Sequence, residues 1–203
     1  APMGYSDNMG DISYVIETNI PDSKYQPVGG LSPMRDRDAL AVSVVEGKAY
    51  KDNETLLENL HHMQNSIIGM EVSNIHFGRP NLSFVYRDTK GAPKGYILAY
   101  EGSVSNTDDQ VNFVYLSDLA TDGSSKMAGG RLISAFFDKY TASYGREKKL
   151  LPIYTNAREA TSFPIIQRQA EDMCREQGLL CKVVEIGLQQ RARATFHNVV
   201  MCI

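Results

Sequence analysis

The spacing of hydrophobic and polar residues predicts distinct strands and helices from the first third of the chain onward. Residues 12–20 alternate apolar and polar side chains, which is typical of a half-buried strand. Residues 21–33 are rich in proline, glycine and serine and are predicted to be a loop. Residues 36–50 and 54–68 repeat apolar positions at a helical period, so two helices are expected there.

The rest of the chain predicts a hairpin followed by alternating strands and helices. Residues 82–87 and 96–100 are aromatic and β-branched runs that flank a connector with glycine and proline, which is typical of a hairpin. Gly178 is expected to end the last helix. Beyond the hairpin, strands are predicted at residues 111–119, 150–154, 181–188 and 195–203, and helices at residues 126–144 and 161–177.

This order of elements shows no repeat and no linker that would divide the chain. We expect residues 1–10 to be a flexible amino-terminal extension and residues 11–203 to form a single α/β domain. A chain of 203 residues is long enough to bury a core without disulfides or a metal.

Composition narrows the class of function. The net charge is -3 and the pI about 5.8, so the chain lacks the basic stripe that nucleic-acid binding needs. No apolar run approaches the length of a membrane span. The cysteines form no CxxC pair or disulfide framework, so we expect reduced thiols and a soluble cytoplasmic protein. The histidines show no HExxH or Cys/His spacing, so we expect no metal. The start at Ala1 indicates a fragment of a longer chain or a cloning remnant, and the oligomeric state stays open.

The stretch with the clearest chemical meaning is residues 111–133, where a strand leads into a turn of small residues that opens an amphipathic helix. The amino end of a helix presents main-chain N–H groups and a positive dipole, and both attract phosphate. Ala128, Gly129 and Gly130 allow an anion to approach the main chain closely. Neither a nucleotide P-loop nor a GxGxxG spacing occurs there. The alternative is that the two glycines only allow close packing of the helix on the sheet.

The element order and two short motifs resemble the GNAT acetyltransferase family through nearly the whole chain. Residues 116–121, Leu-Ser-Asp-Leu-Ala-Thr, are similar to the family's Leu-x-x-Leu-Ala-Val at its splayed fourth strand. Residues 124–131 are similar to its pyrophosphate loop, Arg/Gln-x-x-Gly-x-Gly/Ala. The resemblance implies an α/β fold with a mixed, mostly antiparallel central sheet of about seven strands, flanked by about four helices.

The loop matches the family's motif in either of two registers, and neither is complete. The three signature positions fall on Lys126, Gly129 and Arg131 in one register and on Ser125, Ala128 and Gly130 in the other. A cradle built from main-chain amides tolerates such side-chain departures as long as the small residues remain.

The resemblance implies acetyl-CoA as a co-substrate and no metal. The pyrophosphate would lie on the turn and the helix start, and the pantetheine arm would pair with the end of the strand. Lys126 or Arg131 can add a charge-assisted contact to the phosphate. For Asn156, the alternative to cofactor binding is a role as a helix cap. The expected cofactor-binding residues are Leu119, Ala120, Thr121, Ser124, Ser125, Lys126, Met127, Ala128, Gly129, Gly130, Arg131 and Asn156.

The catalytic residues that the resemblance implies are a carboxylate on the strand and a tyrosine on the following helix, but Tyr115 and Phe163 fall near those positions. Asp118 is the first candidate base, and Tyr154 or Ser162 is the candidate proton donor. Tyr115 is also a candidate catalytic residue, because it falls near the position of the family's carboxylate. The alternatives are a turn-capping carboxylate for Asp118 and a core aromatic for Tyr154.

Two functions therefore stay open. The first is an N-acyltransferase that passes an acetyl group from acetyl-CoA to an amine of a protein lysine or a small molecule, mainly by orienting the reactants. The second is a non-catalytic module that binds CoA or a protein on the same scaffold, since a fold does not settle a function. The expected partners are acyl-CoA and an amine acceptor, without nucleic acid or membrane.

Overall fold

The structure is a computed structural model of the 203-residue chain. The predicted first strand at residues 12–20 and the predicted extension at residues 1–10 lie outside the described residues. The described residues are 30–50, 56–105, 107–145, 150–158, 162–176, 178, 180–191 and 194–202.

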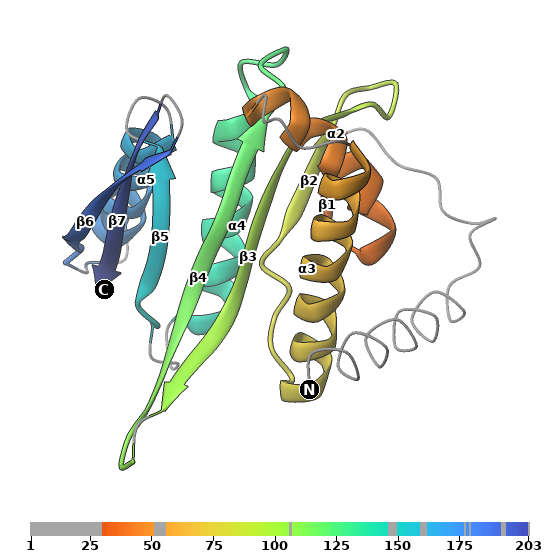
Figure 1. The fold of residues 1–203 in the computed structure, drawn as a ribbon. Coiled ribbons are helices and arrows are strands. Elements are labelled where there is room, and N and C mark those ends of the chain that lie inside the picture. Colours follow the sequence, from red (N-terminus) through yellow and green to blue (C-terminus); the bar gives the residue numbers. More distant parts are fainter. Residues whose placement is uncertain are drawn as a thin grey trace.

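Within these ranges the centre of the molecule is one mixed sheet of seven strands in the order β1-β2-β3-β4-β5-β7-β6 (Figure 1). Neighbouring strands are antiparallel except β4 and β5, which run parallel. The predicted mixed, mostly antiparallel α/β architecture is thereby confirmed. The strands are β1 (Gly30–Pro33), β2 (Phe84–Arg87), β3 (Pro93–Ser105), β4 (Gln110–Thr121), β5 (Ile153–Arg158), β6 (Lys182–Arg191) and β7 (Ala194–Cys202).

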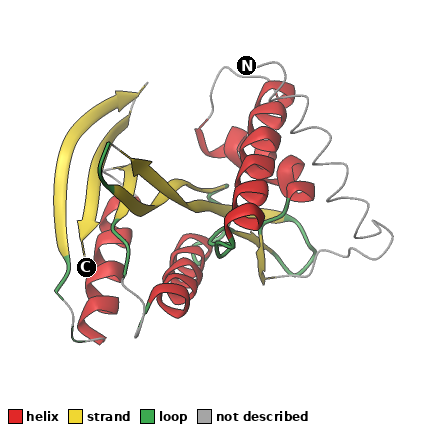
Figure 2. Ribbon diagram, turned by 90° about the horizontal axis from the view of Figure 1, so that it is seen from below, coloured by secondary structure: helices red, strands yellow, loops and turns green. Residues whose placement is uncertain are grey.

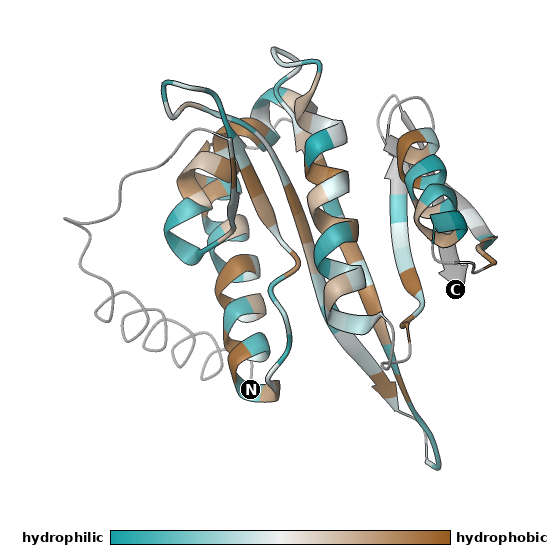
Figure 3. Cartoon of the chain, turned by 180° about the vertical axis from the view of Figure 1, so that it is seen from behind, coloured by the Kyte–Doolittle hydropathy of each residue, from teal (hydrophilic) through white to brown (hydrophobic). Residues whose placement is uncertain are grey.

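Helices cover the two faces of this sheet (Figure 2). Alternate residues of β3 belong to different cores: Ile97 packs with α4 and α5, whereas Tyr96 and Leu98 pack with α2 and α3. Apolar residues accordingly gather on the central strands and alternate with polar residues along the helices (Figure 3). The helices are η2 (Asp36–Asp38, a 3-10 turn), α2 (Ala39–Tyr50), α3 (Leu56–Phe77), α4 (Ala128–Tyr144) and α5 (Ser162–Glu176).

The prediction of a loop throughout residues 21–33 is wrong at its end, because β1 (Gly30–Pro33) pairs there with β2. β1 is the edge strand of the sheet and has only one neighbour. An edge strand tolerates proline, which cannot donate to a ladder, so the composition resembled a loop.

The predicted end of a helix at residue 68 is also wrong, because α3 (Leu56–Phe77) continues through a polar stretch. Glu71 and Asn74 are buried on its inner face, where an apolar residue would have marked a helix. The Arg35 guanidinium lies 2.7 Å from the Glu71 carboxylate. Burial raises the pKa of Glu71, although Arg35 opposes this shift.

Two cysteine side chains lie near each other at the packed face of α5. Cys174 and Cys181 are not joined by a disulfide, and burial together with the neighbouring Cys181 raises the pKa of Cys174 to about 12. No group of three or more His, Cys, Asp or Glu side chains in the described ranges is arranged to hold a metal ion. Among the described helices, none is both long and apolar enough to cross a membrane.

Candidate functional site

The sheet opens between β4 and β5. The two strands pair only from Val114↔Ile153 to Leu116↔Thr155, although each continues beyond this point. The Thr155 hydroxyl donates a hydrogen bond to the Leu116 carbonyl at 3.1 Å and so fixes the last paired position. Past it, β5 keeps β7 as its partner and β4 keeps β3, so the two strands part.

A β-bulge bends β4 at the same position. Leu98 pairs with Asp118 and Ala99 with Leu116, which leaves Ser117 as the extra residue on β4. A bulge turns a strand away from its previous direction and increases its local twist. The opening therefore has a local cause in β4, one residue beyond the last pair with β5.

Asp118 follows this bulge and lies on the face of the sheet that α2 and α3 cover in part, opposite to α4. Its register partner Leu98 packs in the α2–α3 core. The hydroxyl of Tyr96, which is completely buried, donates a hydrogen bond to Asp118 Oδ2. The carboxylate is thus held in place from the neighbouring strand, and the alternative of a turn-capping residue does not describe its position.

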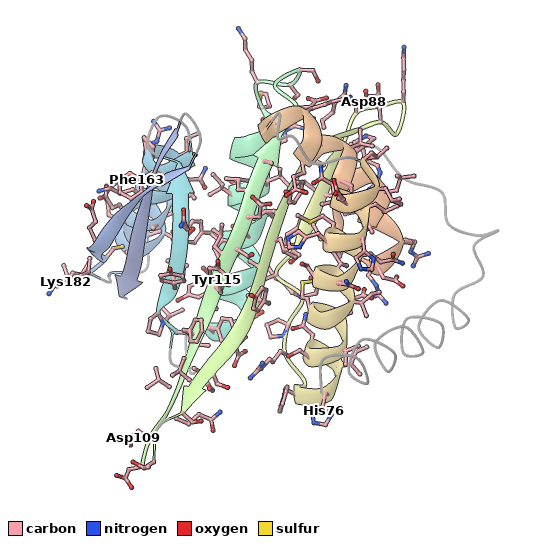
Figure 4. All side chains as sticks on the ribbon, viewed as in Figure 1. His76, Asp88, Asp109, Tyr115, Phe163 and Lys182 are labelled. Atoms are coloured by element: carbon pink, nitrogen blue, oxygen red, sulfur yellow. The ribbon has the colours of Figure 1, made fainter. Side chains whose placement is uncertain are left out.

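A row of three tyrosines crosses β3, β4 and β5 on the same face as Asp118. The Tyr100 and Tyr115 rings lie 5.5 Å apart between centroids, and the Tyr115 and Tyr154 rings 5.2 Å apart. Tyr115 occupies the middle of β4 (Figure 4). Tyr115 and Tyr154, both predicted as catalytic candidates, therefore lie together just before the strands part.

The turn from β4 into α4 is held by Asp122. Its Oδ1 accepts hydrogen bonds from the Ser124 amide at 2.9 Å and the Ser124 hydroxyl at 2.6 Å, and Gly123 between them has φ +78°. The Lys94 ammonium lies 3.5 Å from Asp122 Oδ2. Burial opposes ionisation of Asp122, but the Ser124 hydrogen bonds and Lys94 outweigh it and keep its pKa below the usual range.

This arrangement predicts that Asp122→Asn makes folding less sensitive to acid. A depressed folded-state pKa means that Asp122 stabilises the fold at neutral pH and that this contribution is lost as pH falls below the ordinary aspartate range. We expect Asp122→Asn to lower the free energy of unfolding by about 1 kcal/mol at pH 7. The difference from the wild type should shrink as pH falls from 7 to about 3. Urea titrations at both pH values measure it, and a difference that stays constant would contradict the assignment.

The amino end of α4 is open. Met127 is the N-cap residue and makes no side-chain capping hydrogen bond, and the first turn holds no acidic residue. A Cβ added at Gly130 would meet no atom within 4 Å, and one at Gly129 would only touch the Thr121 methyl at 3.9 Å. The alternative that these glycines serve only close packing is therefore wrong for Gly130. The first turn of a helix has main-chain N–H groups without a partner in the helix, and such groups can bind an anion.

The remaining predicted contacts of the cradle surround this helix end. Ala128 is buried, Lys126 and Met127 are exposed, and Ser125 accepts a hydrogen bond from the Ala128 amide at 3.4 Å. Arg131 is exposed and donates a hydrogen bond to the Tyr86 hydroxyl at 3.3 Å.

The end of β4 and the residues across the opening complete the set. Leu119, Ala120 and Thr121 lie beyond the last pair with β5. Asn156 lies within β5 and pairs with Asn198, so the alternative of a helix cap is wrong. Ser162 begins α5, and its side chain lies outside the described residues; Phe163 follows it on α5 (Figure 4).

Several residues of this site carried no recognisable signal in the sequence. Tyr96 contacts Asp118 only because of the β3–β4 register, which the bulge sets. Lys94 and Tyr100 likewise reach the site from β3, the strand beside β4. Tyrosines at alternate positions of the second hairpin strand were the available hint for Tyr96 and Tyr100.

No protein-family model and no curated protein matches the sequence. The solved structures that are similar to the chain are GNAT-type acetyltransferases, the family that the sequence resembles. One is the histone acetyltransferase HPA2 and related acetyltransferase from Corynebacterium glutamicum, at 15% identity and TM-score 0.47, covering 86% of this chain and 94% of that one. Naa50 from Arabidopsis thaliana, in complex with a bisubstrate analogue, is 10% identical at TM-score 0.47, covering 85% and 97%. An aminoglycoside acetyltransferase from an uncultured soil metagenomic sample is 16% identical at TM-score 0.43, covering 79% and 95%.

Proposed function

We propose that the chain is an acyl-CoA-dependent N-acyltransferase that passes an acetyl group from acetyl-CoA to an amine of a protein lysine or a small molecule. The observation that carries this proposal is the meeting of two sites where β4 and β5 part. On one face lies the open amino end of α4, and on the other lies Asp118. A ligand that passes between the strands reaches both.

The residues at the helix end fit the pyrophosphate of acetyl-CoA. The N–H groups of Gly129 and Gly130 belong to the first turn, where no earlier carbonyl of the helix accepts them. The space beside Gly129 and Gly130 is open, and each of the two motif registers contains one of these glycines. Lys126 and Arg131 are exposed beside it and add positive charge.

The strand end and β5 fit the rest of the donor. The main chain of Leu119, Ala120 and Thr121 borders the opening and can pair with the pantetheine arm as an added strand does. Asn156 directly follows Thr155, the last residue of β5 that pairs with β4. Acetyl-CoA supplies a thioester, whose carbonyl carbon forms the new C–N bond while the C–S bond breaks.

The chain's own residues then have to move one proton and hold the reactants. Asp118, held by the Tyr96 hydroxyl, takes the proton that the amine gives up, directly or through a water molecule. Tyr154 on β5 or Ser162 at the start of α5 returns a proton to the thiolate. Orientation of amine and thioester supplies much of the rate, because bound reactants need no further encounter.

The second candidate function is a CoA-binding module without catalysis, and Phe163 favours it. This phenylalanine lies at the start of α5, near the position of the family's tyrosine, and has no hydroxyl to donate a proton.

One experiment separates the two functions. Calorimetric titration with acetyl-CoA should give saturable binding, and a mixed panel of primary amines should then release free thiol. Binding without thiol release for every amine would favour the module. Absence of binding would overturn the assignment of the α4 end as a CoA site.

A further inference from the structure

The tyrosine row has a geometry suited to a cation. Tyr100 and Tyr115 meet edge to face at an interplanar angle of 87°, and Tyr115 and Tyr154 lie at 32° to each other. Aromatic faces attract cations through the quadrupole of the ring, and tyrosine adds an electron-rich hydroxyl oxygen. Burial and the neighbouring Tyr115 raise the pKa of Tyr100, so its ring stays a neutral phenol.

The row is accessible to a ligand. All three tyrosines are partly exposed, and the described structure gives the Tyr100 and Tyr115 hydroxyls neither a hydrogen-bond partner nor a buried position. Figure 1 shows β4 and β5 with α4 and α5 behind them, whereas α2 and α3 lie over the neighbouring strands. Tyr100 packs against the α2–α3 core and Ala120 at the end of β4 belongs to it, whereas Tyr115 and Tyr154 belong to neither core cluster.

One charged residue of β4 lies on this face. The face is set by the register of β3, β4 and β5, in which Tyr100, Tyr115 and Tyr154 form one line and Leu98 pairs with Asp118. Asp118 is the charged residue of β4 (Gln110–Thr121), whereas the basic Lys94 lies at the far end of β3 and pairs with Asp122. Asp118 thus attracts an acceptor with additional positive charge.

We infer that the acceptor is a small di- or polyamine, whose second, protonated nitrogen binds on the Tyr100–Tyr115–Tyr154 row while the first nitrogen is acetylated beside Asp118. This inference rests on the proposed acetyl transfer. The reacting nitrogen must lose its proton, which Asp118 accepts. The second nitrogen keeps its charge and binds to the tyrosine rings.

The spacing sets the length of the acceptor. Tyr115 and Asp118 are successive residues on one face of β4, apart from the bulge, and therefore lie about 7 Å apart along the strand. A short alkyl diamine spans this distance, so 1,4-diaminobutane is a suitable probe. Its matched control is 4-amino-1-butanol, which keeps the chain and one amine but has a neutral hydroxyl at the other end.

The test uses the full chain, with both probes titrated by calorimetry and then supplied as acceptors with acetyl-CoA. We expect 1,4-diaminobutane to bind and to show a KM roughly threefold to tenfold lower than 4-amino-1-butanol. Tyr115→Phe should keep most of this preference because the ring remains, and Tyr115→Leu should remove it. Tyr100→Leu should weaken it, and the thermal midpoint and acetyl-CoA affinity of each variant report whether its fold is kept.

Two outcomes would overturn the inference. Equal affinity and KM for the two probes would show that the second charge is not recognised. A lysine-containing peptide that is acetylated in preference to the diamine would assign the face to a protein acceptor. Diamine binding that depends on Tyr115 but occurs without acetyl-CoA binding would instead contradict the proposed function and leave the cation site in place.

Discussion

Gly130→Phe should abolish detectable acetyl-CoA binding while the protein stays folded. The side chain would fill the space beside the first turn of α4 and keep a phosphate from the main-chain N–H groups. Two charge-assisted hydrogen bonds, at about 1.5–3 kcal/mol each, would be prevented, so the affinity should fall at least about hundredfold. Calorimetric titration of the variant with acetyl-CoA measures this loss.

The fold should tolerate this substitution because Gly130 is not held by packing or by its backbone. A Cβ there meets no neighbour, and Gly130 is not among the glycines with positive φ. Replacing a helical glycine gains up to about 1 kcal/mol of helix propensity. Gly187→Phe on β6 is the matched control, since it also faces open space but lies away from α4. Unchanged affinity in folded Gly130→Phe would refute the cradle.

The sequence was most informative where a single element carries the signal. The α4 helix was predicted from a stripe of apolar residues, and all of that stripe is buried. Its preceding turn was predicted as an anion site from small residues at a helix start, which is a local property of the chain. The open space beside Gly130 agrees with that interpretation.

The sequence was least informative where two strands have to be aligned. The contact between Tyr96 and Asp118 depends on the extra residue Ser117, which shifts the β3–β4 register by one position. A one-residue shift exchanges the two faces of a strand, so the side of Asp118 could not be assigned beforehand. The edge strand β1 was missed for a related reason, because only its pairing with β2 identifies it as a strand.

The position of the opening follows from two independent features that coincide. The Thr155 hydroxyl donates a hydrogen bond to the Leu116 carbonyl at the last β4–β5 pair. The bulge at Ser117 bends β4 at the next residue. Asp118, the next residue, is therefore carried to the edge of the opening. The main-chain path of β4 places this carboxylate, and the Tyr96 hydroxyl then fixes its orientation.

Tyr96→Phe should lower the rate of acetyl transfer without weakening acetyl-CoA binding. Without this hydrogen bond the Asp118 carboxylate is no longer held in one orientation beside the amine, and we expect kcat to fall about tenfold. Asp118→Asn should cost more, about 10²–10⁴-fold, because it removes the base itself. Thiol-release kinetics with a diamine acceptor, together with acetyl-CoA titrations, separate the effect on kcat from the effect on binding.

Tyr140→Phe is the control for the structural part of this effect. Tyr140 is also completely buried, and its hydroxyl donates one hydrogen bond, to the Leu151 carbonyl at 2.5 Å, away from the opening. Both tyrosine variants should lower the thermal midpoint by a few degrees, since each loses about 1 kcal/mol of hydrogen bonding. Of these two variants, only Tyr96→Phe should lower kcat, because Tyr96 contacts Asp118 and Tyr140 contacts Leu151. An equal fall in kcat for both variants would reduce Tyr96 to a packing residue, and full activity of Asp118→Asn would remove Asp118 as the base.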